Sequence, residues 1–357
     1  MTKGLTSPEV DNEAIDGGLS LPAVLKPSGV RHLLASTAID HAQLLALTFQ
    51  GLDADSAVRP IVWRVLLGLL GPSPAAWTRD LQQKRSGYDA LQRQFPFEGL
   101  RRRHELPKDD ETLLHDIEKD VARTHVHMPF FSLSGVASEW MTRILFLFAK
   151  SHAEIGYCQG MHEIVAPLLY VFGTDSLPDW SSHAEADAFA AFETLMQLLA
   201  PLHLASKTDP KKTGVQVQMA RLHMLLRQHD AALWLQLNSL AVLPEYYSFR
   251  WYITLLSHEF AMDATLRLWD ALLADSKRFA FLHYVSCALI ISHRDALLHR
   301  NADFGVCLTI LQSKPKISIE ALLQKAHALR EVDRDADIKT RTRHHPPPPP
   351  PRSASTT

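Results

Sequence analysis

The sequence predicts an all-α protein, an irregular assembly of many helices arranged in two lobes, and three observations support this. Apolar residues recur at helical spacing through most of residues 37–332. No alternating apolar and polar run is bounded by an Asn-Gly or Asp-Gly turn, so strands are not expected. No repeat of fixed period is found, which argues against a solenoid. With 357 residues, 46% of them hydrophobic, the chain is long enough to bury a core.

The elements follow in order. Residues 1–36 are expected to be a disordered tail, because prolines and glycines interrupt them and no helical period persists. Residues 37–332 form the expected domain, and its helices are predicted at residues 33–49, 59–67, 111–124, 139–149, 164–172, 183–199, 216–228, 231–240, 245–259, 263–273, 279–298 and 317–329. Residues 201–214 are expected to form an internal loop or the boundary between the two lobes. Residues 333–357 are expected to be a second disordered tail, because they are polar and contain six consecutive prolines.

Composition excludes several classes of protein. The 37 basic and 39 acidic side chains leave a formal net charge of -2, which argues against a nucleic-acid binder. The three cysteines are too few and too scattered for a disulfide framework or a four-cysteine zinc site, so a reducing compartment is expected. No signal pattern and no apolar run of bilayer length occurs. We therefore expect a cytoplasmic protein with no direct membrane insertion, recruited to membranes only through a partner.

Familiar catalytic motifs are absent from the sequence. There is no phosphate-binding loop and no dinucleotide glycine fingerprint. His104-Glu105, His162-Glu163 and His258-Glu259 each begin like a zinc-protease motif, but none has the second histidine on the same helical face. A metal site is therefore not expected. A helical hydrolase acting alone is a poor reading, because no pair of nucleophile and base is found.

One segment, residues 111–124, combines an apolar helical face with an arginine near its end. At about 100° per residue the apolar side chains share one face, and they are Leu113, Leu114, Ile117 and Val121. Arg123 falls on the opposite side, and Asp120 lies three residues before it, within reach of the guanidinium. Taken alone, the pattern is more typical of an exposed ion pair that contributes little to stability, because such pairs are common.

A second segment, residues 155–161, places glycines around a tyrosine and a glutamine between two helical patterns. Gly156 suits the left-handed conformation that follows a helix end, and Gly160 permits a close approach of another backbone. Tyr157 is expected to anchor the loop while Gln159 projects from it. Taken alone, the segment favours a simpler interpretation of Gln159, as a polar turn residue that satisfies nearby backbone groups.

Together with a third segment, these motifs resemble the TBC domain, the catalytic domain of GTPase-activating proteins for Rab GTPases. The family's three motifs stand here, in order, as Arg59 and Trp63 followed by Leu66-Leu67-Gly68, then Ile117, Asp120, Arg123 and Thr124, then Tyr157, Gln159, Gly160 and Met161. The resemblance covers residues 37–332 and is nearest to family members that consist of little more than the domain. Two departures are visible: Asp53 follows Gly51-Leu52 where the family often has proline, and His162 stands where it often has asparagine.

The resemblance implies a mechanism with two inserted side chains, which we call the fingers. Arg123 would be the arginine finger, and Gln159 would orient the attacking water in the partner's nucleotide site. Asp120 would hold Arg123 or its helix end, and Tyr157 and Gly160 would shape the glutamine loop. Arg59 and Trp63, from the first motif, would support the site.

The resemblance also implies the partners. The substrate would be a Rab-family small GTPase, which itself binds GTP and Mg²⁺, so this chain needs no cofactor of its own. The alternative is a helical module that binds a Rab or another trafficking factor without stimulating hydrolysis.

A smaller hypothesis concerns residues 346–352, where Pro347, Pro350 and Arg352 match a ligand for an SH3-type domain. A tail without a partner explains the same run more simply.

Overall fold

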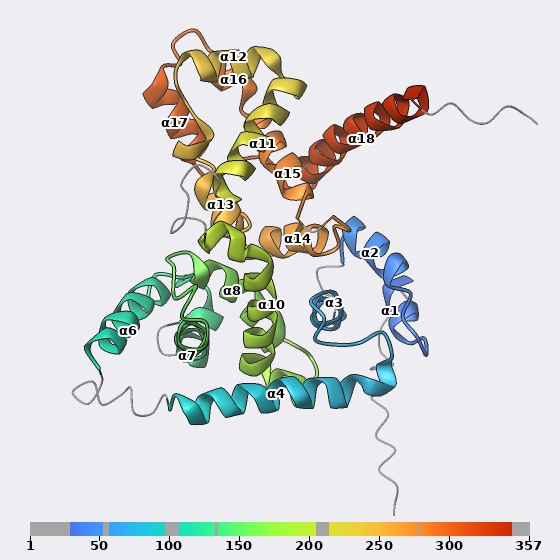
Figure 1. Ribbon diagram of the computed structural model, residues 1–357, viewed down its shortest axis with the longest axis vertical. Coiled ribbons are helices and arrows are strands. Elements are labelled where there is room, and N and C mark those ends of the chain that lie inside the picture. The colour runs from blue at the N-terminus through green and yellow to red at the C-terminus, as the bar shows by residue number, and fades with distance from the viewer. Residues whose placement is uncertain are drawn as a thin grey trace, which may run out of the picture.

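The computed structural model describes residues 29–52, 57–96, 107–132, 135–204, 214–277 and 279–344. All regular secondary structure in these ranges is helical, which confirms the predicted fold class. Figure 1 shows the helices in two groups, with α10 (Ala184–Leu204) ending one group and α11 (Gly214–His229) beginning the other. The change of group falls at residues 201–214, where the sequence indicates a lobe boundary.

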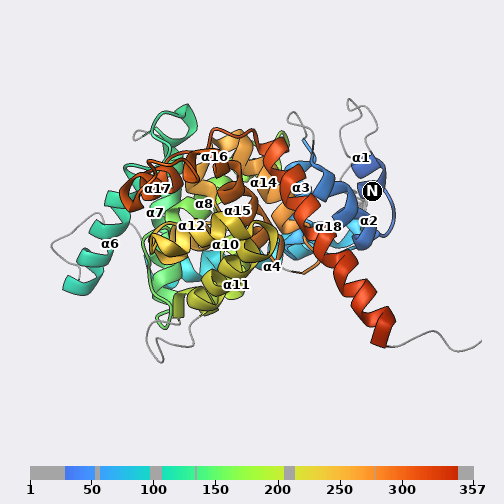
Figure 2. The same ribbon diagram turned by 90° about the horizontal axis from the view of Figure 1, so that it is seen from above.

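The first group contains the N-terminal elements, seen from above in Figure 2. Besides α10, its α-helices are α1 (Gly29–Leu34), α2 (His41–Gln50), α3 (Arg59–Leu66), α4 (Trp77–Gln94), α6 (Lys108–Val121), α7 (Val136–Ser151), α8 (Met161–Gly173) and α9 (Pro178–Ser181). Two short 3₁₀ helices, η1 (Pro74–Ala76) and η3 (Pro129–Phe131), connect them.

The second group contains the C-terminal elements. Besides α11, its α-helices are α12 (Ala231–Ser239), α13 (Phe249–Ile253), α15 (Phe281–Ser292), α16 (Arg294–Leu297), α17 (Phe304–Gln312) and α18 (Ile319–His344), and α14 (Met262–Leu273) lies between the two groups. The 3₁₀ helices here are η4 (Pro244–Tyr246) and η5 (Ser257–Glu259).

Helix α8 is the centre of the fold. Eleven of its side chains are buried, and it packs against α10, α7, α6, α3 and α14. Pro167 lies inside this helix. Because α8 is enclosed and, apart from its first turn, almost entirely apolar, the loop that leads into its first residue, Met161, ends at a fixed point. That loop carries Gln159.

A buried ion network joins α3 to the start of α10. The side chain of Arg64 is fully buried and pairs with Asp175 at 2.9 Å and with Asp187 at 2.8 Å. Its guanidinium also lies 4.3 Å from the ring centre of Phe172 and 4.8 Å from that of Trp180. A buried charge needs such ion-pair partners, because an ion left unpaired loses on the order of several kcal/mol in hydration.

Three predicted helices are broken in the structure. Residues 33–49 divide into α1 and α2, with Asp40 capping α2 through the backbone N–H of Gln43. Residues 245–259 divide into η4, α13 and η5, because Leu255 and Leu256 have φ of 50° and 61°. Residues 279–298 divide into α15 and α16 at His293. Periodicity counts apolar positions and does not detect such local turns.

The described helices also extend beyond the domain limits expected from the sequence. α1 lies within the segment expected to be a tail, and its Val30, Leu33 and Leu34 are buried at helical spacing. α18 crosses residue 333 and runs to His344. Asp333 is packed there, accepting a hydrogen bond from the hydroxyl of Tyr284 at 3.0 Å. The sequence reading also named neither α4 nor α17.

Several expectations fall outside the described residues: Asp53, His104-Glu105, residues 1–28 and the proline segment 346–352. Among the described helices, none is both long enough and apolar enough to cross a membrane.

Candidate functional site

The first candidate residue, Arg123, lies just beyond the C-terminal end of α6. The helix buries Leu114, Ile117 and Val121 against the fold, and the two residues that follow its last turn, Ala122 and Arg123, are exposed. Arg123 Nη2 donates to Asp120 Oδ1 at 2.7 Å, and the arginine side chain is 55% exposed whereas that of Asp120 is 10% exposed. The contact between Asp120 and Arg123 expected from their spacing is present, and it holds an outward-facing guanidinium on a largely buried carboxylate.

The second candidate residue, Gln159, is exposed in the loop between α7 and α8. Gly156 has φ 66° and Gly160 has φ 106°, so both use backbone conformations that favour glycine. A Cβ on Gly160 would lie 3.4 Å from Ile253 and 3.5 Å from Thr254, which places the loop against the end of α13. The two glycines therefore turn the chain sharply and present Gln159 to the outside.

Asp120 joins these two elements. Its Oδ1 accepts from Arg123, and its Oδ2 accepts from the hydroxyl of Tyr157 at 2.6 Å. Burial raises the pKa of Tyr157 well above its ordinary value, and the neighbouring Asp120 raises it further. The tyrosine therefore stays protonated and keeps donating. One carboxylate thus fixes both the end of α6 and the loop that carries Gln159.

A group of ionisable side chains lies next to Asp120 and Tyr157. His162 Nδ1 is 3.3 Å from the Tyr157 hydroxyl and 3.5 Å from Asp120 Oδ2, and the residue is 3% exposed. Burial lowers the pKa of His162, although Glu163 and Asp120 act in the opposite direction. The neutral form of the imidazole is therefore favoured.

Glu163 is the acidic centre of this group. Its Oε1 lies 2.8 Å from His258 Nδ1, on η5, and its Oε2 lies 3.8 Å from His125 Nε2. Burial acts to raise the pKa of Glu163, but the hydrogen bond and the charge of His258 outweigh it, so the pKa is lowered. Burial lowers the pKa of His125. Despite these histidines, no group of three or more residues suited to hold a metal ion exists among the described residues.

The sequence predicts no role for His162-Glu163 or His258-Glu259, because neither forms a zinc-protease motif, and no sequence motif includes His125. The structure brings members of all three segments together. His258 and Glu163 are 95 positions apart in the chain, so no local pattern reveals their contact. The sequence contains only a weak sign of this cluster of histidines around Glu163: a histidine and a glutamate directly follow the glutamine loop, at the start of an otherwise apolar helix.

Comparison with known proteins places this arrangement in a family. The family model of the Rab-GTPase-TBC domain matches residues 56–298, which include Arg123 and Gln159. This chain belongs to the Rab-GTPase-TBC domain family.

Relatives and a solved structure agree with this membership. TBC1 domain family member 13 of Mus musculus is 30% identical over 81% of this chain and 94% of its own length. The Homo sapiens member 13 is 29% identical over 84% of this chain and 96% of its own length. The crystal structure of the Ypt/Rab-GAP domain of Gyp1p superposes with a TM-score of 0.73 at 27% identity, covering 85% of this chain and 97% of that chain.

Two of the predicted supporting residues of this TBC domain lie in a separate cluster. Arg59 donates from Nε and Nη2 to Asp270 of α14 at 3.1 and 3.0 Å, and the indole of Trp63 donates to Asp270 at 2.9 Å. The same carboxylate accepts from the backbone of Leu52 at 3.3 Å. Arg59 and Trp63 therefore fasten α3 to α14, whereas Asp120, Tyr157 and Gly160 contact the finger elements directly.

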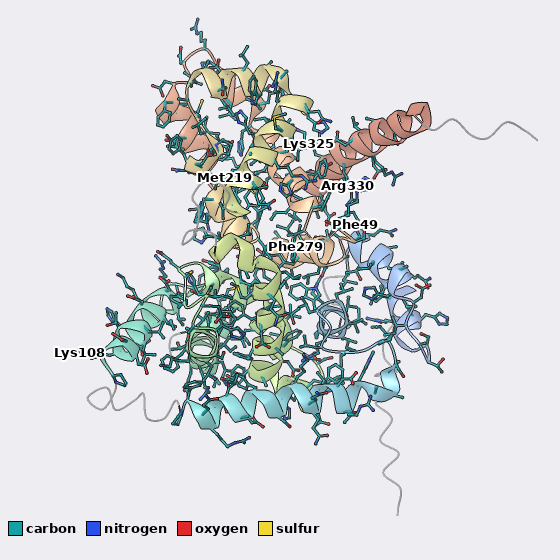
Figure 3. The ribbon with its side chains drawn as sticks, viewed as in Figure 1. Phe49, Lys108, Met219, Phe279, Lys325 and Arg330 are labelled. Carbon is teal, nitrogen blue, oxygen red and sulfur yellow. The ribbon has the colours of Figure 1, made fainter. Side chains whose placement is uncertain are left out.

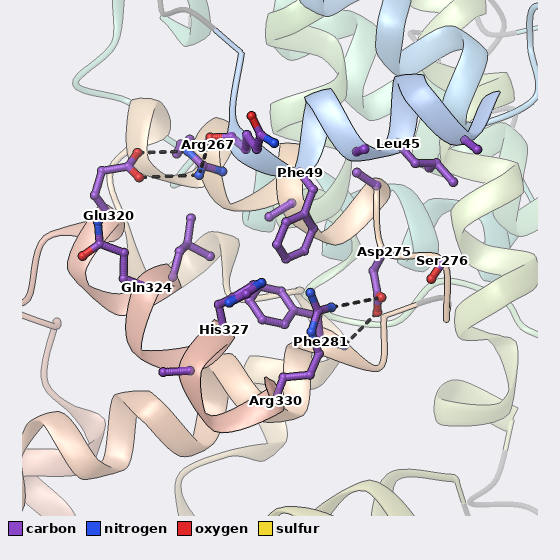
Figure 4. A pocket seen from close by; sticks show the side chains of 17 residues that line it. Leu45, Phe49, Arg267, Asp275, Ser276, Phe281, Glu320, Gln324, His327 and Arg330 are labelled. Carbon is purple, nitrogen blue, oxygen red and sulfur yellow. Dashed lines mark hydrogen bonds and ion pairs between the residues drawn. The ribbon is translucent and has the colours of Figure 1, made fainter. Parts of the chain in front are cut away.

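A cavity of about 730 Å³ lies elsewhere in the chain, between α2, α14 and α18. Figure 4 shows the Arg330 guanidinium beside the rings of Phe49 and Phe281, at 4.7 and 4.6 Å from their centres, and 3.5 Å from Asp275. Phe49 and Arg330 come from α2 and α18, on facing sides of the cavity (Figure 3), and both lie outside the matched TBC residues. Neither Arg123 nor Gln159 lines this cavity.

Proposed function

We propose that this chain is a GTPase-activating protein that accelerates GTP hydrolysis by a Rab-family small GTPase. The observation that carries the proposal is the shared anchoring of Arg123 and Gln159. Both side chains are exposed, and the two elements that bear them meet on Asp120 through hydrogen bonds of 2.7 and 2.6 Å. Exposed side chains held in this way suit a reaction that takes place in another protein's site.

Arg123 supplies positive charge to the transferred phosphoryl group. In the transition state, negative charge is spread over the phosphate oxygens, and a planar, permanently charged guanidinium can donate to two of them. An arginine finger contributes about 10³- to 10⁵-fold in rate. Only one nitrogen of Arg123 is engaged by Asp120, so the opposite edge of the guanidinium is available to the partner.

Gln159 positions the attacking water. Its amide oxygen accepts a hydrogen bond from the water and its amide nitrogen donates one to a phosphate oxygen, and it does both without changing its protonation state. GTP and Mg²⁺ are bound by the partner, so this chain requires no cofactor of its own. Any contact with a membrane is made through a partner, because the reaction needs no apolar anchor on this chain.

The test is single-turnover GTP hydrolysis by a panel of purified Rab GTPases, with wild type, Arg123→Ala and Gln159→Ala compared. One or a few Rabs are expected to hydrolyse GTP faster, with the acceleration reduced about 10³-fold or more in Arg123→Ala. Arg79→Ala is the matched control, because Arg79 is an arginine on α4 with an 83% exposed side chain.

Two results would contradict the proposal. If some Rabs bind but none responds to the wild-type protein, the chain is a binding module. If Arg123→Ala and Arg79→Ala are equally active, Arg123 is not a finger.

A further inference from the structure

The tautomer of His162 follows from its neighbours. The Tyr157 hydroxyl has one proton and donates it to Asp120 Oδ2 at 2.6 Å. His162 Nδ1, 3.3 Å from the same hydroxyl oxygen, can therefore contact it only as a donor. The neutral ring accordingly carries its proton on Nδ1, which leaves the lone pair on Nε2, 3.8 Å from Glu163 Oε1. His162 Nδ1 thus lies 3.3 Å from the Tyr157 hydroxyl and 3.5 Å from Asp120 Oδ2, while these two groups are hydrogen-bonded to each other.

We propose that His162 is a positioning residue that keeps the Tyr157 hydroxyl on Asp120, and that its protonation loosens the pairing of Asp120 with Arg123 and so lowers GTPase activation. The inference rests on the proposed function, because it concerns how the same two fingers are held. His162 itself does not enter the partner's site, since it is 3% exposed.

The charges around His162 determine what protonation does. Charged and titratable groups surround it on three elements. They are Asp120, Arg123 and His125 from α6 and the residues after it, His258 from η5, and Glu163 at the adjacent position on α8. A second proton, added at Nε2, makes the ring an imidazolium, whose Nδ1 atom lies 3.5 Å from Asp120 Oδ2. It then competes with both Tyr157 and Arg123 for one carboxylate, and it repels the Arg123 guanidinium.

The direction of the pH response follows from burial. Burial lowers the pKa of His162 below its ordinary value and outweighs the carboxylates of Glu163 and Asp120. The ring is therefore neutral at neutral pH, where the fingers are held, and it gains a proton as the pH falls below about 6.5. Activation should decline in that acidic range.

Asparagine at position 162 provides a non-titrating comparison. Its amide nitrogen is separated from Cα by the same number of bonds as the histidine Nδ1, so it can donate to Tyr157 but cannot become charged. Leucine removes the donor altogether. His115 lies on the exposed side of α6, so His115→Asn is the matched control for replacing a histidine by asparagine.

The first experiment is the pH profile of GTPase activation between about pH 8 and pH 5, with the intrinsic rate of the GTPase subtracted at each pH. Wild type and His115→Asn are expected to lose activation by up to about tenfold per pH unit below the pKa of His162. His162→Asn should retain more activity than His162→Leu at neutral pH and should lack the acidic decline. If His162→Asn declines as wild type does, the inference is wrong.

A second experiment tests the coupling in the free protein. The pKa of His162 is followed by NMR with labelled histidine. Tyr157→Phe leaves Asp120 Oδ2 to His162 alone and should raise this pKa, whereas Asp120→Asn removes the negative charge and should lower it. Opposite shifts support the coupling, and the absence of both overturns it. If these shifts occur and no Rab is activated, the proposed function fails while the coupling stands.

Discussion

Gly160 provides a sharp test of how the glutamine loop is positioned. Its φ of 106° and ψ of -20° lie away from the left-handed helical well, which is centred near about +57° and +47°. An alanine there should cost about 2–3 kcal/mol in backbone strain. A Cβ would contact Ile253 and Thr254 at 3.4 and 3.5 Å, which are ordinary packing distances, so steric overlap adds little.

Gly156 is the matched control in the same loop. Its φ of 66° lies close to the left-handed well, and a Cβ there would meet no heavy atom within 4 Å. Gly156→Ala should therefore cost about 1–2 kcal/mol. The two substitutions add the same methyl group to the same loop and differ mainly in how far the backbone must move to relieve the strain.

The expected functional difference follows from that movement. Gly160→Ala can relieve its strain only by rotating the backbone next to Gln159, and a displacement of about 1 Å costs about a hundredfold in rate. We expect kcat/KM for a responsive GTPase to fall about a hundredfold in Gly160→Ala and less than about tenfold in Gly156→Ala. Urea unfolding of both variants measures the strain separately.

The reasoning is refuted if Gly160→Ala is as active as wild type, or if the two variants lose equal activity despite unequal stability. Either result would mean that the conformation of Gly160 does not set the position of Gln159.

Three other substitutions have defined outcomes. Arg64→Met leaves the buried Asp175 without its guanidinium, whereas Asp187 keeps its pairing with Arg85, and urea unfolding should show a loss of about 3 kcal/mol; an unchanged midpoint would contradict the network. Arg59→Ala leaves Asp270 buried without its guanidinium and should lower the free energy of unfolding by about 3–5 kcal/mol. Single-turnover assays of the folded fraction should show a smaller loss of GTPase activation than Arg123→Ala does, and a larger loss would assign Arg59 to the finger site. Arg123→Lys keeps the charge but loses the planar fork, so its rate should lie nearer to Arg123→Ala than to wild type, and a rate close to wild type would show that charge alone suffices.

Sequence reasoning succeeded where a helix is governed by its own periodicity. α6, α7, α8, α10 and α14 were all anticipated, because each has an apolar face or core that repeats at helical spacing. It failed at residues 245–259, where two buried leucines, Leu255 and Leu256, adopt positive φ. Only the surrounding tertiary packing can impose such a conformation on leucine, so a single sequence carries no local sign of it.

The candidate site likewise contains contacts that depend on local spacing in the chain and contacts that depend on tertiary packing. The pairing of Asp120 with Arg123 was predictable, because it depends on a spacing of three along one helix. The roles of Arg123 and Gln159 came from the resemblance to the TBC domain and remain a proposal. The contacts of Glu163 with His258 and His125 could not be predicted, because they join α8 to distant parts of the chain.

The pairing of Arg123 with Asp120 also has a consequence for association. A free arginine side chain has about 2 kcal/mol of rotamer entropy, which is lost when it docks into a partner. Here much of that freedom is already restricted during folding, since one guanidinium nitrogen is fixed on a carboxylate whose side chain is only 10% exposed. Preorganisation of this kind could tighten the complex with a GTPase by up to about thirtyfold. Part of the conformational entropy of Arg123 is therefore lost when the protein folds, and it is not lost again when a GTPase binds.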